Sequence, residues 1–79
     1  MKWVLPAADT YFAPLLTEDG FQIERLREAL EYVTSFRLAV DGGAHIGTWS
    51  VYLARVFAHV VAFEPAADTY HCLVENVLR

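Results

Sequence analysis

Two short apolar runs, separated by a segment of helical spacing, constrain the fold of this 79-residue chain more than any other feature. The first run covers residues 36–40 and leads into an acid and two glycines at residues 41–43, and the second covers residues 59–64 and stops at Pro65. Short apolar runs bounded by glycine or proline are typical of buried strands. Because a helix-length segment joins them, we expect the two strands to pair in parallel and to be buried on both faces.

Three segments around these strands carry apolar residues at helical spacing. The first is expected to run from Asp19, as N-cap, to about Thr34, with its apolar stripe at positions 23, 26, 30 and 33. The second is expected over residues 46–57, and the third over residues 67–78. The third has Asp68 and Thr69 as candidate caps. The predicted apolar faces are Val51, Leu53, Ala54 and Phe57 in the second helix, and Tyr70, Leu73, Val74 and Val77 in the third.

The order of these elements predicts the fold class. A helix followed by strand, helix, strand and helix is the opening of a doubly wound α/β sheet. We therefore predict a partial Rossmann-like cofactor-binding domain over residues 18–79, with two parallel strands in an incomplete sheet, preceded by an irregular N-terminal segment over residues 1–17. Open sheet edges also favour self-association, because their unpaired backbone groups can bind a second chain.

Composition and charge narrow the classes of function. The net charge of −4 and the dispersed basic residues argue against nucleic-acid binding, which favours a basic face. No apolar stretch approaches the roughly 20 residues that span a bilayer, so no membrane partner is expected. A single cysteine excludes an internal disulfide framework, and three separated histidines give no metal-ligand spacing. We expect a cytoplasmic protein without a bound metal.

The sequence VDGGAHIG at residues 40–47 has the pattern of a ligand-binding loop. It places an acid at a strand end, then glycines that let a ligand approach the backbone, then a helix start with free amides. Glu64 ends the second strand 21 residues after Gly43, where a carboxylate can accept both hydroxyl hydrogens of a ribose. Because ligands of open α/β sheets bind at the carboxyl ends of the strands, Asp41 and Glu64 are expected to border one nucleoside site.

Two nucleoside cofactors fit this pattern to different degrees. An NAD-binding fingerprint requires G-x-G-x-x-G, and this chain supplies only G-x-A-x-x-G, with Ala44 where the pyrophosphate needs room. Asp41 would also place a negative charge near that pyrophosphate. S-adenosylmethionine has no phosphate, and Asp41 can hold its ammonium group directly or through water. It is therefore the favoured cofactor, and an NAD-binding Rossmann fragment is an alternative.

The loop and the second strand together resemble the FkbM family of methyltransferases. VDGGAHIGTWS resembles that family's D-x-G-A-[NH]-x-G loop, and VVAFEPAADTYHCLVENV resembles its F-E-P strand end and its L-x-x-N-hydrophobic helix. The resemblance covers about residues 37–79, and Gly42 departs from it, because an apolar residue is more usual there. The matching positions are Asp41, Gly43, Ala44, His45 and Gly47, then Phe63, Glu64 and Pro65, then Leu73, Asn76 and Val77.

The resemblance implies a Rossmann-like domain that binds S-adenosylmethionine and transfers its methyl group, usually to a hydroxyl oxygen. The cofactor residues that it implies are Asp41, Gly43, Ala44, His45, Gly47 and Glu64. The loop would contact the methionine part and Glu64 the ribose. The resemblance assigns neither a catalytic residue nor a methyl acceptor. Because the regions for adenine and acceptor would follow residue 79, we expect these residues alone not to methylate anything. A non-catalytic binding module that oligomerises through its sheet edges is a further alternative.

Overall fold

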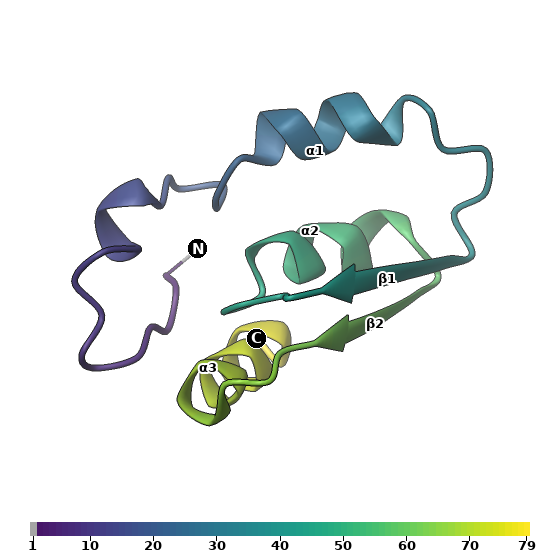
Figure 1. The fold of residues 1–79 in the computed structure, drawn as a ribbon. Helices are drawn as coiled ribbons and strands as arrows, with labels where there is room; N and C mark the ends of the chain where they lie inside the picture. Colours follow the sequence, from purple (N-terminus) through teal and green to yellow (C-terminus); the bar gives the residue numbers. More distant parts are fainter. Residues whose placement is uncertain (1) are drawn as a thin grey trace.

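Two parallel strands, β1 (Leu38–Gly42) and β2 (His59–Phe63), lie side by side. Helices α1 (Ile23–Leu30) and α2 (Thr48–Val56) pack against one face of the sheet that the strands form (Figure 1). The computed structural model describes residues 2–79, so Met1, the first residue of the predicted irregular segment, lies outside the described residues. The described chain is a small α/β domain with an open sheet. Its elements are the 3-10 helix η1 (Ala13–Leu15), α1 (Ile23–Leu30), β1 (Leu38–Gly42), α2 (Thr48–Val56), β2 (His59–Phe63) and α3 (Ala67–Val77).

The parallel pairing predicted from the two apolar runs is confirmed. Leu38 of β1 lies beside His59 of β2, and the pairing continues to the last residue of both strands. β1 begins at Leu38 and not at Phe36, which lies before the strand and packs its ring on Phe57 at a centroid distance of 5.0 Å. β1 extends instead through Gly42, so the acid that follows the apolar run is part of the sheet.

The hydrophobic core lies between the sheet and helices α1 and α2. At its centre, Ile23 and Leu26 of α1 pack with Leu53 of α2, and all three side chains are buried. Partly buried neighbours complete the core: Leu30, Ala39, Trp49, Tyr52, Phe57 and Val60. Because side chains alternate between the faces of a strand, Ala39 and Val60 are the strand residues that meet these helices.

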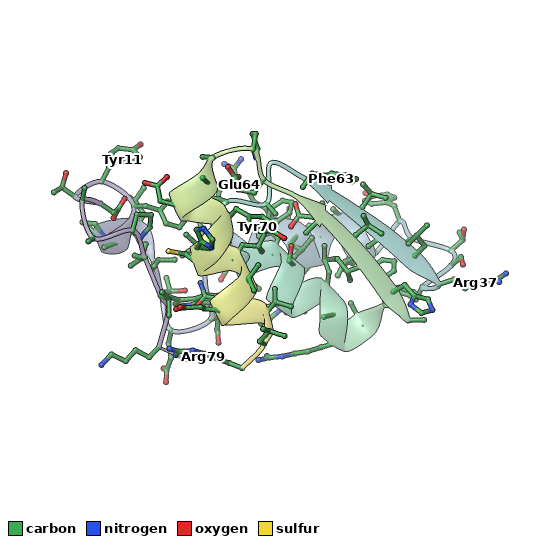
Figure 2. All side chains as sticks on the ribbon, turned by 90° about the horizontal axis from the view of Figure 1, so that it is seen from below. Tyr11, Arg37, Phe63, Glu64, Tyr70 and Arg79 are labelled. Atoms are coloured by element: carbon green, nitrogen blue, oxygen red, sulfur yellow. The ribbon has the colours of Figure 1, made fainter. Side chains whose placement is uncertain are left out.

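The opposite face of the sheet is exposed, so the prediction that both faces are buried is wrong for the described chain. Leu38, Val40, Val61 and Phe63 are 58%, 63%, 43% and 58% exposed. They alternate with the core-facing residues along each strand, because successive side chains point to opposite faces. In Figure 2, Phe63 lies near Glu64 at one end of the sheet, and Arg37 lies at the other end.

The start of α1 differs from the predicted capping by Asp19. The N-cap is Gln22, in the left-handed conformation (φ 53°, ψ 36°), and its side chain makes no capping bond. Just before it, the backbones of Thr17 and Gly20 bind each other, with N···O distances of 2.7 and 3.1 Å. Gly20 has a φ of 126°, which other residues rarely adopt. This tight turn, and not a capping carboxylate, sets where the helix begins; the helix also ends earlier than predicted, at Leu30.

Helix α3 buries only part of its predicted face, because Leu73 is buried as predicted and two of the other predicted residues are not. Tyr70 and Val77 are 46% and 49% exposed, whereas Cys72, Leu73 and Asn76 are buried. This orientation follows from two contacts, since Leu73 packs over the start of α2 and Asn76 binds backbone groups of two other segments. Burial raises the pKa of the Cys72 thiol, which suits a small packing residue.

Helix α2 also departs from its predicted apolar face. Leu53 is buried as predicted, but Ala54 is exposed, and the polar side chains of Thr48 and Ser50 are buried. A buried hydroxyl needs a hydrogen-bond partner to offset its desolvation. For Ser50 that partner is Asp41, at the candidate site.

The N-terminal segment is held against the domain by Asn76 of α3. The Asn76 side-chain nitrogen donates to the carbonyl oxygens of Val4 at 3.0 Å and Ile46 at 2.8 Å, and its oxygen accepts from the Val4 amide at 2.8 Å. The segment contains the short helix η1, where irregular structure was predicted. No helix within residues 2–79 combines the length and the apolar character needed to cross a membrane.

Candidate functional site

The loop between β1 and α2 leaves the sheet at the carboxyl end of β1. Three of its residues have positive φ: Gly43 at 68°, His45 at 56° and Gly47 at 94°. A backbone conformation with positive φ is readily adopted by glycine and disfavoured for other residues. The loop conformation therefore depends on its glycines. The Ala44 amide donates to the Phe63 carbonyl at 2.9 Å, and the Gly47 amide donates to the Ala44 carbonyl at 2.9 Å. The first bond holds the loop against the end of β2, and the second closes a turn within the loop.

An open pocket of about 370 Å³ lies over this loop, within the size range of small-molecule sites. Its lining comes from the end of β1, the loop, the start of α2 and the N-terminal part of the chain: Asp41, Gly42, Gly43, Ala44, His45, Thr48, Trp49, Phe12, Phe21 and Gln22. A methyl group added at Gly42 or Gly43 would meet no atom within 4 Å, so the backbone there is open to a ligand. Of the predicted cofactor residues, Gly47 and Glu64 do not line the pocket.

Asp41 is oriented by a residue of α2. Its Oδ2 accepts a hydrogen bond of 2.7 Å from the hydroxyl of the buried Ser50. Within the described chain, no hydrogen bond reaches Asp41 Oδ1. The carboxylate is therefore held at the strand end by one oxygen, and its second oxygen can accept a hydrogen bond from an ammonium or hydroxyl group.

Glu64 ties the loop to the start of α3. Its Oε1 accepts from the backbone N–H of His45 at 2.8 Å, and its Oε2 accepts from the backbone N–H of Ala66 at 3.1 Å. Ala66 is the N-cap of α3, and Asp68 and Thr69 make no capping bond among the described residues, contrary to the prediction. Because each carboxylate oxygen has two acceptor positions, Glu64 keeps capacity for ribose hydroxyls. That role stays a prediction.

His45 contributes its backbone to the loop and its ring to the pocket. The ring packs on Phe12, with centroids 4.4 Å apart and ring planes tilted by 52°. Its Nδ1 is buried and makes no hydrogen bond with any residue that the structure describes. An unsatisfied buried polar atom costs about 1–3 kcal/mol, so this orientation of the ring lowers the stability of the loop.

The aromatic lining of the pocket was missed by the sequence analysis. Phe12 and Phe21 lie in the N-terminal part of the chain, yet both line the pocket. Trp49 links this part to α2, because its Nε1 donates to the Phe21 carbonyl oxygen at 2.8 Å. No motif marks Phe12, since its place depends on the N-terminal segment folding back over the loop. The L-x-x-N pattern in the sequence did mark Asn76, but it does not identify the backbone groups that Asn76 binds.

Within residues 2–79, no three His, Cys, Asp or Glu side chains are grouped so as to hold a metal ion. Comparison with protein-family models, with curated proteins and with solved structures finds no match to this chain. The geometry of the pocket and the residues that line it are therefore the basis for assigning a function.

Proposed function

We propose that this chain is the Rossmann-like, cofactor-binding front half of an S-adenosylmethionine-dependent methyltransferase that acts on a hydroxyl oxygen. The observation that carries the proposal is the pocket at the carboxyl end of β1, where Asp41 and open glycine backbone line the same space. Ligands of parallel α/β sheets bind at this end of the strands. The resemblance of the loop and strand end to the FkbM family supports the same cofactor.

The charge of the pocket favours S-adenosylmethionine over a dinucleotide. Asp41 is its one acidic side chain, and neither lysine nor arginine of residues 2–79 lines it. A pyrophosphate is bound by cations and hydrogen-bond donors, whereas a methionine ammonium is bound by an acceptor. Asp41 Oδ1 is the acceptor that we assign to the ammonium. Glu64, after the end of β2, is the residue that we assign to the ribose.

The cofactor supplies a methyl group bound to a positively charged sulfur. In the transfer, the carbon–sulfur bond breaks as a carbon–oxygen bond forms, the sulfur leaves as a neutral thioether, and the hydroxyl proton passes to solvent or to a base of the acceptor site. The part played by the described residues is to bind and position the donor, which contributes to catalysis through alignment. Asp41, held by Ser50, performs this positioning at the end of β1.

Titration calorimetry of the chain with S-adenosylmethionine tests the assignment of Asp41. We expect the wild type to bind and Asp41→Asn to bind about tenfold or more weakly, because a hydrogen bond to a charged group contributes about 1.5–3 kcal/mol. Asparagine keeps the size of the side chain and a partner for Ser50, so the loss reports the charge. Asp68→Asn changes the net charge equally at an exposed position on α3, and its affinity should equal that of the wild type.

Glu64→Gln is the second variant in this titration, and we expect it also to weaken binding. If Asp41→Asn and Glu64→Gln both bind S-adenosylmethionine as well as the wild type does, these residues do not form the cofactor site. Tighter binding of NAD than of S-adenosylmethionine by the wild type would instead favour the dinucleotide alternative.

The exposed sheet face favours a second candidate, a non-catalytic module that self-associates. Leu38, Val40, Val61 and Phe63 form an apolar surface, and each strand of the two-stranded sheet has an unpaired edge. For this candidate we expect sedimentation equilibrium to show dimers or larger species, and Val40→Lys to shift them to monomer. Tyr32→Lys, at an 86% exposed position outside the sheet, is the matched control. A wild type that stays monomeric at high concentration would exclude this candidate.

A further inference from the structure

The aromatic residues of the pocket form a connected wall. The Phe12 ring lies 4.9 Å from the Phe21 ring and 4.4 Å from the His45 ring, measured between centroids, with tilts of 53° and 52°. Trp49 lines the same pocket and is fixed by its Nε1 bond to the Phe21 carbonyl oxygen. The pocket therefore combines several ring surfaces with the carboxylate of Asp41.

The segment that carries Phe12 is fixed by its own hydrogen bonds. The Asp9 carboxylate accepts from the backbone N–H of Phe12 at 3.1 Å and of Ala13 at 2.9 Å, which holds the start of η1. Further along, the backbone bonds between Thr17 and Gly20 close a tight turn before Phe21. The rings are thus positioned without a ligand, so little conformational freedom is lost when one binds.

The aromatic ring surfaces and the Asp41 carboxylate all attract cations. The face of an aromatic ring attracts a cation within about 6 Å of its centroid, and Asp41 attracts a cation through its charge. Within the described chain, no lysine or arginine lines the pocket to compete for these partners. A phosphate would meet apolar rings and a like charge.

We infer that Phe12 and Phe21 make this pocket selective for a second cationic centre, the sulfonium of S-adenosylmethionine, beside the ammonium that Asp41 binds. The inference rests on the proposed function and extends it, because it gives the N-terminal segment a role in specificity. The rings stabilise the charged methyl donor and offer less to the neutral thioether that remains after transfer. The product therefore binds more weakly than the donor and leaves the site.

The test compares the affinities of S-adenosylmethionine and S-adenosylhomocysteine by calorimetry. The two share the ammonium, ribose and adenine and differ in the sulfonium charge and its methyl group, so their affinity ratio reports the sulfonium contact. We expect the wild type to prefer S-adenosylmethionine and Phe12→Leu to lower this preference about fivefold, the size of a cation–π contact. Leucine keeps an apolar side chain but removes the ring. Phe12→Tyr keeps the ring and should keep the ratio.

Phe36→Leu is the matched control for this experiment. Phe36 is also a partly exposed phenylalanine paired with another ring, Phe57 at 5.0 Å, but it does not line the pocket. The same substitution there should leave the ratio of affinities unchanged. Circular dichroism and urea unfolding confirm that each variant is folded, and Phe21→Leu replaces Phe12→Leu, with the same expectation, if the latter does not fold.

The outcomes separate this inference from the proposed function. If both ligands bind and the ratio in Phe12→Leu equals that of the wild type, the inference is overturned and the proposed function stands. A lowered ratio in Phe12→Tyr would also overturn it, because the ring face is still present. If the wild type binds neither ligand, the proposed function fails and the inference fails with it.

Discussion

Replacing Asn76 with alanine is expected to lower the free energy of unfolding by about 3 kcal/mol, because it leaves several backbone groups without partners. The amide of Asn76 is 1% exposed and binds both backbone groups of Val4 and the carbonyl oxygen of Ile46. Its loss would detach the N-terminal segment from α3 and from the loop before α2. Urea unfolding followed by circular dichroism measures the change.

Two further variants make the Asn76 result specific. Asn76→Asp keeps an acceptor for the Val4 amide but places an oxygen against the carbonyl oxygens of Val4 and Ile46, so we expect a loss at least as large. Glu75→Ala removes the exposed neighbour on the same helix and should change stability by less than about 0.5 kcal/mol. A small effect of Asn76→Ala, equal to that of Glu75→Ala, would show that the three bonds contribute little.

Gly47→Ala is expected to destabilise the protein by about 2–3 kcal/mol, through backbone strain and overlap. Gly47 has a φ of 94°, and a β-carbon there would lie 2.7 Å from Cδ1 of Leu73, which is itself buried. The overlap would separate α3 from the start of α2 and move the loop that holds the candidate site. The midpoint of urea unfolding reports the loss of stability.

Two nearby glycines, Gly43 of the same loop and Gly42 at the end of β1, separate the effect of backbone strain from that of overlap. A β-carbon at Gly43 would meet no atom within 4 Å but would be strained by the φ of 68°, so Gly43→Ala should cost about 1 kcal/mol. Gly42 has neither constraint, and Gly42→Ala should change stability by less than about 0.5 kcal/mol. Equal effects at the three positions would contradict this explanation.

The parallel pairing and the order of elements were predictable because they depend on local sequence. Short apolar runs that end in glycine or proline, joined by a helix-length segment, leave few other arrangements. The N-cap of α1 could not be predicted from the local sequence. Asp19 has the chemistry of an N-cap, but the tight backbone turn of Thr17 and Gly20 places Gln22 at that position instead.

Which faces are buried also depended on tertiary contacts. A helical stripe in α3 predicted Leu73, Tyr70 and Val77 on the buried side. Leu73 is buried, but the bonds of Asn76 turn the helix so that Tyr70 and Val77 are about half exposed. The two strands were predicted to be buried on both faces because their sequences are apolar throughout. The described residues supply helices for one face only.

The sequence by itself determined the loop at the end of β1, with Asp41 and its glycines, since acid, glycine and helix start follow one another along the chain. It also placed Glu64 at the end of the neighbouring strand, because Pro65 stops the apolar run there; in the structure Glu64 comes directly after Phe63, the last residue of β2. Only the tertiary structure decided what surrounds Asp41. Ser50 and the rings of Phe12 and Phe21 reach the pocket because α2 packs on the sheet and the N-terminal segment folds back over the loop. Contacts between distant segments leave no spacing pattern in a sequence, so the aromatic side of the pocket became visible only in the folded chain.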